Sequence, residues 1–254
     1  DLSYRDAGKI KPMASLQPAL ITYYRQVHNE VVRTAQAFVE TPTADWLHDL
    51  RVQLKRIRFI RHLVKHYGWG GYHHLFRHYL AIFKEAGRIR GHQMNRYRLT
   101  GTLDMAEPDV REKRMVRHFQ RQLVHALKKI DHDYTRIEKR LSKFSFPGEA
   151  AFVHDLENHV RTRITPYLFT EQLHRSRKRL KEIAYGAEVS EYIRTQLNLR
   201  FSMAVVAELE DKIGDWHDLA LAYETPGLSS PTRERLLIQK KQKLDAVYRL
   251  VRAL

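Results

Sequence analysis

Cysteine is absent from the 254 residues of this sequence. Disulfide bonds, zinc–thiolate sites, iron–sulfur clusters and thiol catalysis are therefore excluded. The sequence also has no run of about 18 apolar residues, the length at which a helix can span a membrane. Its first stretch, DLSYRDAGKIKPM, lacks the apolar segment of a secretory signal peptide. We therefore expect a soluble protein located in the cytoplasm.

Glycine and proline are scarce, with 11 and 8 residues in the whole sequence. They fall mainly between long segments in which apolar residues recur every three or four positions, as in amphipathic helices. Segment 109–144 is a long segment of this kind, and Thr43 is placed to cap a helix that begins near Ala44. The few breaks and the long segments predict an all-α protein with roughly eight helices.

The charge is strongly unbalanced, because 45 lysine and arginine residues oppose 29 aspartate and glutamate residues and give a net charge of +16. Such an excess of positive charge repels itself in the folded state and attracts polyanions from solution. Nucleic acid, polyphosphate and anionic membrane surfaces are therefore the candidate partners, and small neutral substrates are disfavoured.

Segment 47–59, LHDLRVQLKRIRF, predicts an amphipathic helix with an unusual second face. Its apolar stripe consists of Leu47, Leu50, Leu54 and Ile57. A column of basic residues follows one position later with the same spacing: His48, Arg51, Lys55 and Arg58, continued by His62. Like charges three or four positions apart destabilise a helix by about 0.2–0.5 kcal/mol per pair. A single column of this kind is usually solvated surface, but it also suits the binding of an anion.

The column occurs a second time in segment 173–185, LHRSRKRLKEIAY. The basic residues at the offsets of the first column are His174, Arg177 and Lys181. Solvated surface has no reason to preserve these residue types at matched positions, so the repeat favours anion binding. Arginine offers a planar fork to phosphate oxygens and lysine a mobile point charge.

A second echo relates FKEAGRIRGH at 83–92 to EDKIGDWHDL at 210–219 and places Gly87 and Gly214 at equivalent positions. Repeats at a similar distance indicate that the chain consists of two related helical halves. The predicted halves are residues 1–146 and 147–254. If they pack about a pseudo-twofold axis, the two basic columns face each other across a groove or pore.

The motif LH-x2-R-x3-K, present twice in a basic, all-helical chain with a Gly-x3-Asp echo, resembles the CHAD family, the conserved histidine α-helical domain. The resemblance spans nearly the whole chain. It implies two four-helix bundles related by a pseudo-twofold axis, with a basic central cavity between them. It also implies binding of inorganic polyphosphate and association with polyphosphate granules, without catalysis.

Residue by residue, the resemblance implies that the signature histidines are His48 and His174. Its motif cations are Arg51, Lys55, Arg56, Arg58, Arg177, Lys178 and Lys181. Arg88 and Arg90 extend the predicted polyphosphate site, and further candidates are Arg117, Arg121 and Lys128. Two positions depart from the family pattern: Ala184 stands where an arginine is frequent, and Gly91 where an aspartate is common.

The sequence gives little support for a metal centre, a cofactor or a catalytic site. The histidines with helical chelate spacing are His73, His74 and His78, but no HEXXH motif or completing ligand accompanies them. Walker, G-x-S-x-G and Rossmann glycine motifs are absent. The candidate acidic residues are Glu85, Asp211, Asp215 and Asp218, and we expect them to pair with cations or cap helices.

Two other kinds of partner fit the same charge. Nucleic acid would reward the same phosphate contacts through counterion release, although helix-turn-helix, zinc-finger and RRM signatures are absent. The third possibility is a docking role in which the basic face meets an acidic protein. A competition experiment with long polyphosphate and nucleic acid at equal phosphate concentration distinguishes polyphosphate binding from nucleic acid binding.

Overall fold

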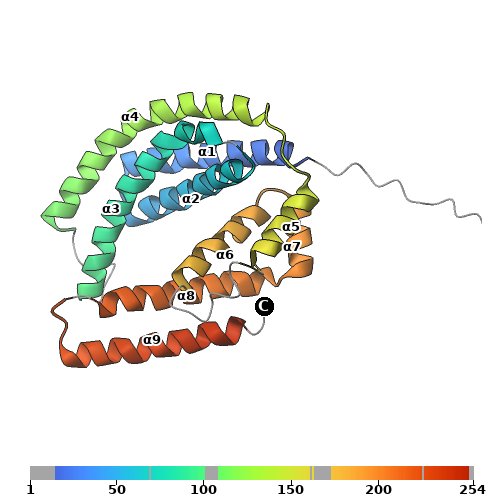
Figure 1. Cartoon of the computed structure of the whole chain (residues 1–254). Coiled ribbons are helices and arrows are strands. Elements are labelled where there is room, and N and C mark those ends of the chain that lie inside the picture. Colours follow the sequence, from blue (N-terminus) through green and yellow to red (C-terminus); the bar gives the residue numbers. More distant parts are fainter. Residues whose placement is uncertain are drawn as a thin grey trace, which may run out of the picture.

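The computed structural model describes residues 15–68, 70–100, 108–160, 162, 173–224 and 226–251, apart from the side chains at 70, 72, 73, 95–100 and 174. These residues form an all-α structure of nine α-helices and one 3-10 helix, without a strand (Figure 1). The predicted fold class is therefore confirmed.

The helices begin and end close to the breaks that the sequence predicts. In chain order they are α1 (Leu16–Glu40), α2 (Ala44–His66), η1 (Gly70–Phe76), α3 (Arg77–Thr100), α4 (Val110–Leu141), α5 (Glu149–His159), α6 (Leu173–Ala187), α7 (Glu191–Arg200), α8 (Met203–Tyr223) and α9 (Ser230–Val251). Thr43 caps α2 as predicted, because its hydroxyl accepts a hydrogen bond from the amide of Trp46 at 3.2 Å. The long helix predicted over 109–144 is α4.

The described residues contain one more α-helix than the roughly eight expected from the sequence. The additional helix arises because the segment between Gly186 and Gly214 is divided into α7 and α8 without a glycine or proline. The hydroxyl of Ser202 accepts a hydrogen bond from the amide of Val205 and caps α8, while Phe201 adopts an extended conformation. A serine cap alone is a weak sequence signal, so the break was missed.

Helices α1–α4, together with η1, form a bundle in which α1 and α3 each pack against both α2 and α4 (Figure 1). Large side chains that are fully buried fill its interior, among them Tyr24, Phe38, Leu54, Ile57 and Tyr79. Each such side chain contributes about 1.5–3 kcal/mol of burial free energy. The longest helix, α4, arches over the outer side of this bundle. The apolar stripe of α2 therefore faces inward and leaves its basic column at the margin.

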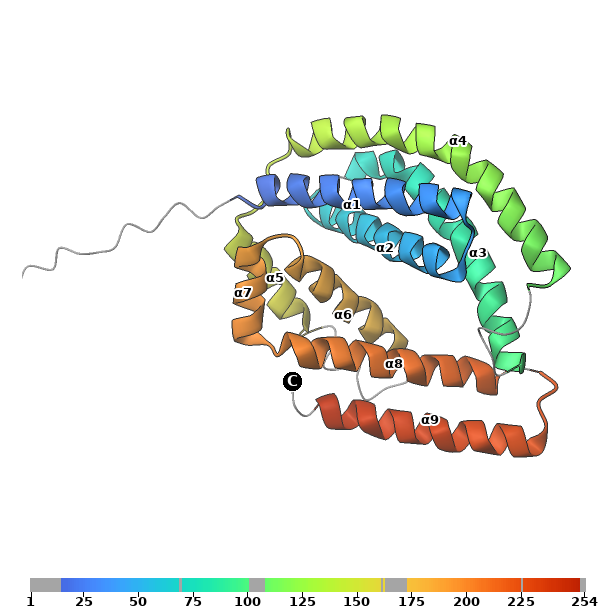
Figure 2. The same cartoon turned by 180° about the vertical axis from the view of Figure 1, so that it is seen from behind.

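Helices α5–α9 form the second part of the molecule (Figure 2). Helix α6 packs against α5, α7 and α8, and α9 packs against α8. Buried residues at these contacts include Leu180, Ile183, Ile193 and Leu209. The loop containing Pro147 joins α4 to α5. The division of the chain at this loop and the pseudo-twofold relation between the halves stay predictions.

Polar contacts connect α2 with α6 and the residue that follows it. The Arg56 guanidinium donates hydrogen bonds of 2.7 and 2.8 Å to the two carboxylate oxygens of Glu188, just after α6. The Tyr23 hydroxyl of α1 donates to the same carboxylate at 2.8 Å. The hydroxyl of Tyr67, which follows α2, donates to Asp155 of α5 at 2.8 Å. These bonds set the position of one basic column relative to the other.

We expect the Arg56–Glu188 pair to stabilise the contact between the two halves. Replacement of either residue by glutamine should lower the free energy of unfolding by about 1.5–3 kcal/mol, as for hydrogen bonds to charged groups. A double-mutant cycle monitored by urea unfolding measures the coupling. The exposed pair Arg33–Glu30 on α1 is the control, and its coupling should stay below about 0.5 kcal/mol. Equal coupling in both cycles would contradict the prediction.

Candidate anion-binding site between α2 and α6

The two motif helices bring their basic columns together. Lys55 of α2 lies within electrostatic range of Lys181 and Arg177 of α6, and of Arg51 on its own helix. Burial, followed by the positive charges of these neighbours, lowers the pKa of Lys55 to about 8. A lysine with its pKa depressed in this way is held among like charges with little compensation. We call Arg51, Lys55, Arg58, Arg177 and Lys181 the central cluster.

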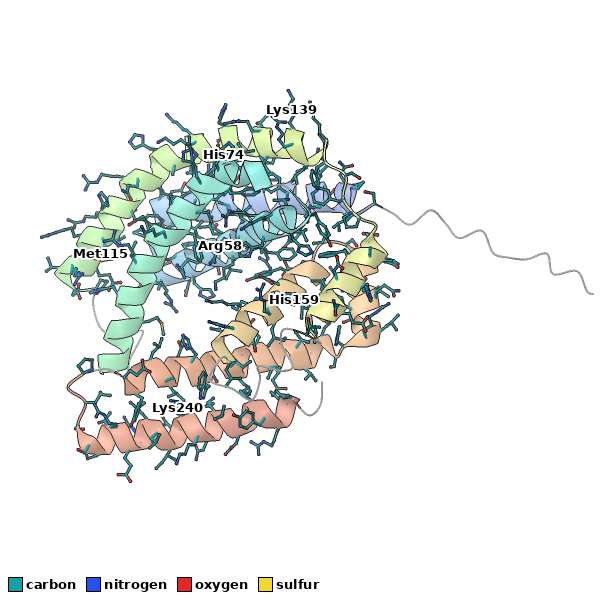
Figure 3. The ribbon with its side chains drawn as sticks, viewed as in Figure 1. Arg58, His74, Met115, Lys139, His159 and Lys240 are labelled. Carbon is teal, nitrogen blue, oxygen red and sulfur yellow. The ribbon has the colours of Figure 1, made fainter. Side chains whose placement is uncertain are left out.

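In the first half, the cluster is held against α3 by an aromatic ring. The Arg51 and Arg58 guanidinium carbons lie 4.8 and 4.7 Å from the centroid of Phe83, and Figure 3 labels Arg58 on α2. Arg51 also donates a hydrogen bond of 3.3 Å to the Phe83 carbonyl. A Cβ atom at Gly87 would lie 2.6 Å from an Arg51 nitrogen, so glycine permits this close approach.

In the second half, the cluster is held against α8 by a carboxylate. Glu210 accepts a hydrogen bond of 3.2 Å from Arg177 and lies 2.9 Å from the Lys181 ammonium. A Cβ atom at Gly214 would lie 2.6 Å from an Arg177 nitrogen. The two glycines that the second echo aligned therefore each accommodate a motif arginine.

The arginines of the first column are short of counter-charge. Burial lowers the pKa of Arg51, and the charges of Arg90 and Arg58 lower it further. Burial and the charge of Arg61 lower the pKa of Arg58 in the same way, and the negative charge of Glu182 offsets part of this effect. The side chains of all three of Arg51, Lys55 and Arg58 are only partly exposed. Such an arrangement attracts a multivalent anion that can reach between the helices.

His48 lies at the edge of this positive region. Burial, followed by the charges of Lys55 and Arg90, lowers the pKa of its imidazole below the ordinary value of 6.5. The ring is therefore mostly neutral near pH 7, and at that pH it can offer one N–H donor to an anion rather than a full charge. Its equivalent, His174, occupies α6, but its side chain lies outside the described part of the chain.

The structure separates three of the predicted residues from the central cluster. Arg56 is engaged with Glu188, as described above. Arg88 is exposed on α3 and forms an ion pair of 3.1 Å with Glu85, one helical turn away. Lys178 is exposed on α6. Arg90, by contrast, lies close enough to His48 and Arg51 to lower the pKa of both.

Glu210 is the residue that sequence reasoning missed. The acidic residues considered from the sequence were Glu85, Asp211, Asp215 and Asp218. Two of them pair with cations as expected, Glu85 with Arg88 at 3.1 Å and Asp215 with Lys243 at 2.7 Å. Glu210 precedes Gly214 by four positions, so both lie on the same face of a helix. Together with the second echo, this spacing could have identified Glu210 as a neighbour of Arg177.

The described residues contain no group of three histidine and acidic side chains arranged to hold a metal ion. Among the three histidines with chelate spacing, the ring of His78 bonds to the buried carboxylate of Asp133 at 2.7 Å, while the side chain of His73 lies outside the description. Among the described helices, none is both long enough and apolar enough to cross a bilayer.

Comparisons with known proteins identify the relatives of this fold. The crystal structure of the CHAD domain from the plant Ricinus communis is similar over 95% of this chain and 93% of that chain, with a TM-score of 0.67 and 17% sequence identity. No curated protein sequence matches this chain. A family model, that of the CHAD domain, matches residues 22–225. Because this match covers most of the chain, the protein belongs to the CHAD domain family.

Proposed function

We propose that this protein binds inorganic polyphosphate, without catalysing a reaction on it, through the central cluster between α2 and α6. One observation carries the proposal: the Lys55 amine is partly buried beside cations from both motif helices, so that its pKa falls to about 8. A group in such a position lowers its free energy when an anion replaces the missing counter-charge. The binding takes place in the cytoplasm and directs the protein to polyphosphate granules.

The chemistry of the cluster suits a flexible chain of phosphates. Arginine and lysine recognise phosphate oxygens without reading a base or a sugar. Several such contacts along one chain add their free energies, and each neutralised phosphate releases condensed counterions. The family resemblance implies the same class of ligand. The proposed affinity therefore falls steeply as salt concentration rises.

Charge reversal at Lys55 and Lys181 tests the site. The double variant Lys55→Glu/Lys181→Glu should weaken polyphosphate binding by at least about a hundredfold, because it places two carboxylates among the remaining arginines. Titration calorimetry with polyphosphate of narrow length distribution measures the affinity, and circular dichroism checks the helical content. The variant Arg88→Glu/Lys178→Glu changes the net charge equally but lies outside the cluster, so it should lose less than about fivefold. Equal losses would show that net charge alone governs binding.

The pKa of Lys55 predicts a pH dependence. Below about pH 8 its amine is charged and contributes to binding, and above it the free amine is neutral, so polyphosphate affinity should fall as the pH rises through about 8. Calorimetry at about pH 7 and 9 measures the fall. Lys55→Arg should remove most of it, since the guanidinium stays charged. An unchanged pH dependence in Lys55→Arg would assign it to another group.

The same pKa predicts that the stability of the ligand-free protein changes with pH in the direction opposite to the affinity. The pKa of Lys55 lies below the ordinary lysine value of 10.5, so the unfolded chain holds this proton more tightly than the folded one. The free energy of unfolding of the ligand-free protein should therefore rise over the interval in which affinity falls. Urea unfolding across this interval checks the sign.

Nucleic acid binding is a second candidate function, and the outer face of α4 favours it. All ten lysine and arginine residues of α4 are exposed: Arg111, Lys113, Arg114, Arg117, Arg121, Lys128, Lys129, Arg136, Lys139 and Arg140. Its four acidic residues are buried, as Glu112 and Asp133 are, or face α1, as Asp131 and Glu138 do. In both views α4 lies on the outside of the molecule, and Lys139 on it is labelled in Figure 3.

The candidates Arg117, Arg121 and Lys128 thus belong to this outer face and not to the central cluster. Their charge reversal should abolish binding of a labelled DNA duplex, measured by fluorescence anisotropy, and leave polyphosphate affinity within about threefold. The Lys55→Glu/Lys181→Glu variant should lose polyphosphate affinity and keep its binding of the duplex. Duplex binding that survives reversal of the α4 residues would remove nucleic acid as a function of this face.

A further inference from the structure

The two halves hold their motif arginines by different chemistry at equivalent positions. Phe83 precedes Gly87 by four residues, and Glu210 precedes Gly214 by four residues. Each glycine accommodates a motif arginine, Arg51 in the first half and Arg177 in the second. The residue that contacts the arginine is therefore aromatic in one half and acidic in the other.

This difference changes the charge that each half presents. The Phe83 ring orients Arg51 and Arg58 through its electron-rich face, but it leaves both positive charges in place. The Glu210 carboxylate contacts both Arg177 and Lys181 and cancels one of their two charges. About a fifth of the Glu210 side chain is exposed to solvent.

Glu210 and a phosphate group require the same donors. A phosphate oxygen that bonds to Arg177 and Lys181 takes the place of the Glu210 carboxylate or lies next to it. Two anionic groups at that separation repel each other strongly in a partly buried site. Glu210 therefore opposes the binding of an anion to the second half, and Phe83 exerts no such opposition in the first half.

Glu210 also has a role in the ligand-free protein. Its charge raises the pKa of Lys55 and so offsets part of the repulsion from Lys181, Arg51 and Arg177. Removal of this carboxylate leaves the central cluster with less compensation when no ligand is bound. The same residue thus stabilises the empty site and competes with whatever fills it.

We infer that Glu210 is a built-in counter-ion that a phosphate group of the polyanion displaces from Arg177 and Lys181. It sets the affinity of the site and makes the first half the stronger anion subsite. This inference rests on the proposed polyphosphate function and adds to it a residue that limits binding.

The variant Glu210→Gln tests the inference because it keeps the shape of the side chain and removes the charge. It should bind polyphosphate about threefold to tenfold more tightly by titration calorimetry at low salt. Its midpoint of urea unfolding without ligand should fall below that of the wild type. Glu85→Gln removes the same charge from a residue paired with Arg88, outside the cluster, and should change affinity by less than about twofold.

The converse variant introduces the counter-ion into the first half. Phe83→Glu places a carboxylate between Arg51 and Arg58 and should weaken polyphosphate binding by about threefold to tenfold. Phe83→Leu removes the ring without adding charge, so the additional loss of affinity from Phe83→Leu to Phe83→Glu measures the effect of the carboxylate alone. Circular dichroism confirms that each variant is folded. Glu210→Gln alone carries the test if Phe83→Glu does not fold.

The possible outcomes separate this inference from the proposed function. Tighter binding by Glu210→Gln together with lower stability supports the inference, since a purely structural residue would lower stability without raising affinity. Unchanged or weaker binding by Glu210→Gln overturns it, provided that the wild type binds and Lys55→Glu/Lys181→Glu does not. A wild-type protein that fails to bind polyphosphate overturns the proposed function, and this inference with it.

Discussion

Repulsion among partly buried cations is the constraint around which the interface between α2 and α6 is arranged. Lys55 shares this space with Arg51, Arg177 and Lys181, and burial together with their charges lowers the pKa of its amine to about 8. Nothing in these charges favours the close approach of the two helices. The approach depends on the buried core of the first bundle and on bonds such as that between Arg56 and Glu188. Burial of the core and these hydrogen bonds therefore offset the repulsion among the cations between α2 and α6.

The motif arginines Arg51 and Arg177 pack in the same way, against a glycine, but their positive charges have different neighbours. Gly87 and Gly214 leave room for a guanidinium against the helix behind it, where any Cβ atom would collide. Phe83 then contributes an electron-rich face, which holds the charge without cancelling it. Glu210 contributes a full negative charge. A site with uncompensated charge on one side binds anions more strongly there, at a cost in stability that the counter-ion limits on the other side.

Periodicity in the sequence was sufficient to predict the all-α class, the cap at Thr43 and the long helix α4, because these depend on spacing within one segment. It also identified Lys55 as a member of a basic column. It did not determine which neighbour each column meets. Arg56 bonds to Glu188 and Arg117 lies on an outer face, since a helical position fixes the direction of a side chain but not the helix packed against it. Glu210 was missed although its spacing from Gly214, together with the second echo, could have identified it.

The central cluster and the outer face of α4 differ in how far their cations are buried. This difference bears on which polyanion each surface suits. The cations of α4 are exposed, so a wide and rigid duplex with phosphates on its outside can reach them. Burial is the largest cause of the low pKa of Lys55, so its amine is withdrawn from the open surface. Under the proposed function, a single narrow chain of phosphates can approach such a partly buried amine more closely than a wide duplex can. The proposed selectivity for polyphosphate at the centre would then follow from access, without any group that recognises the phosphate linkage itself.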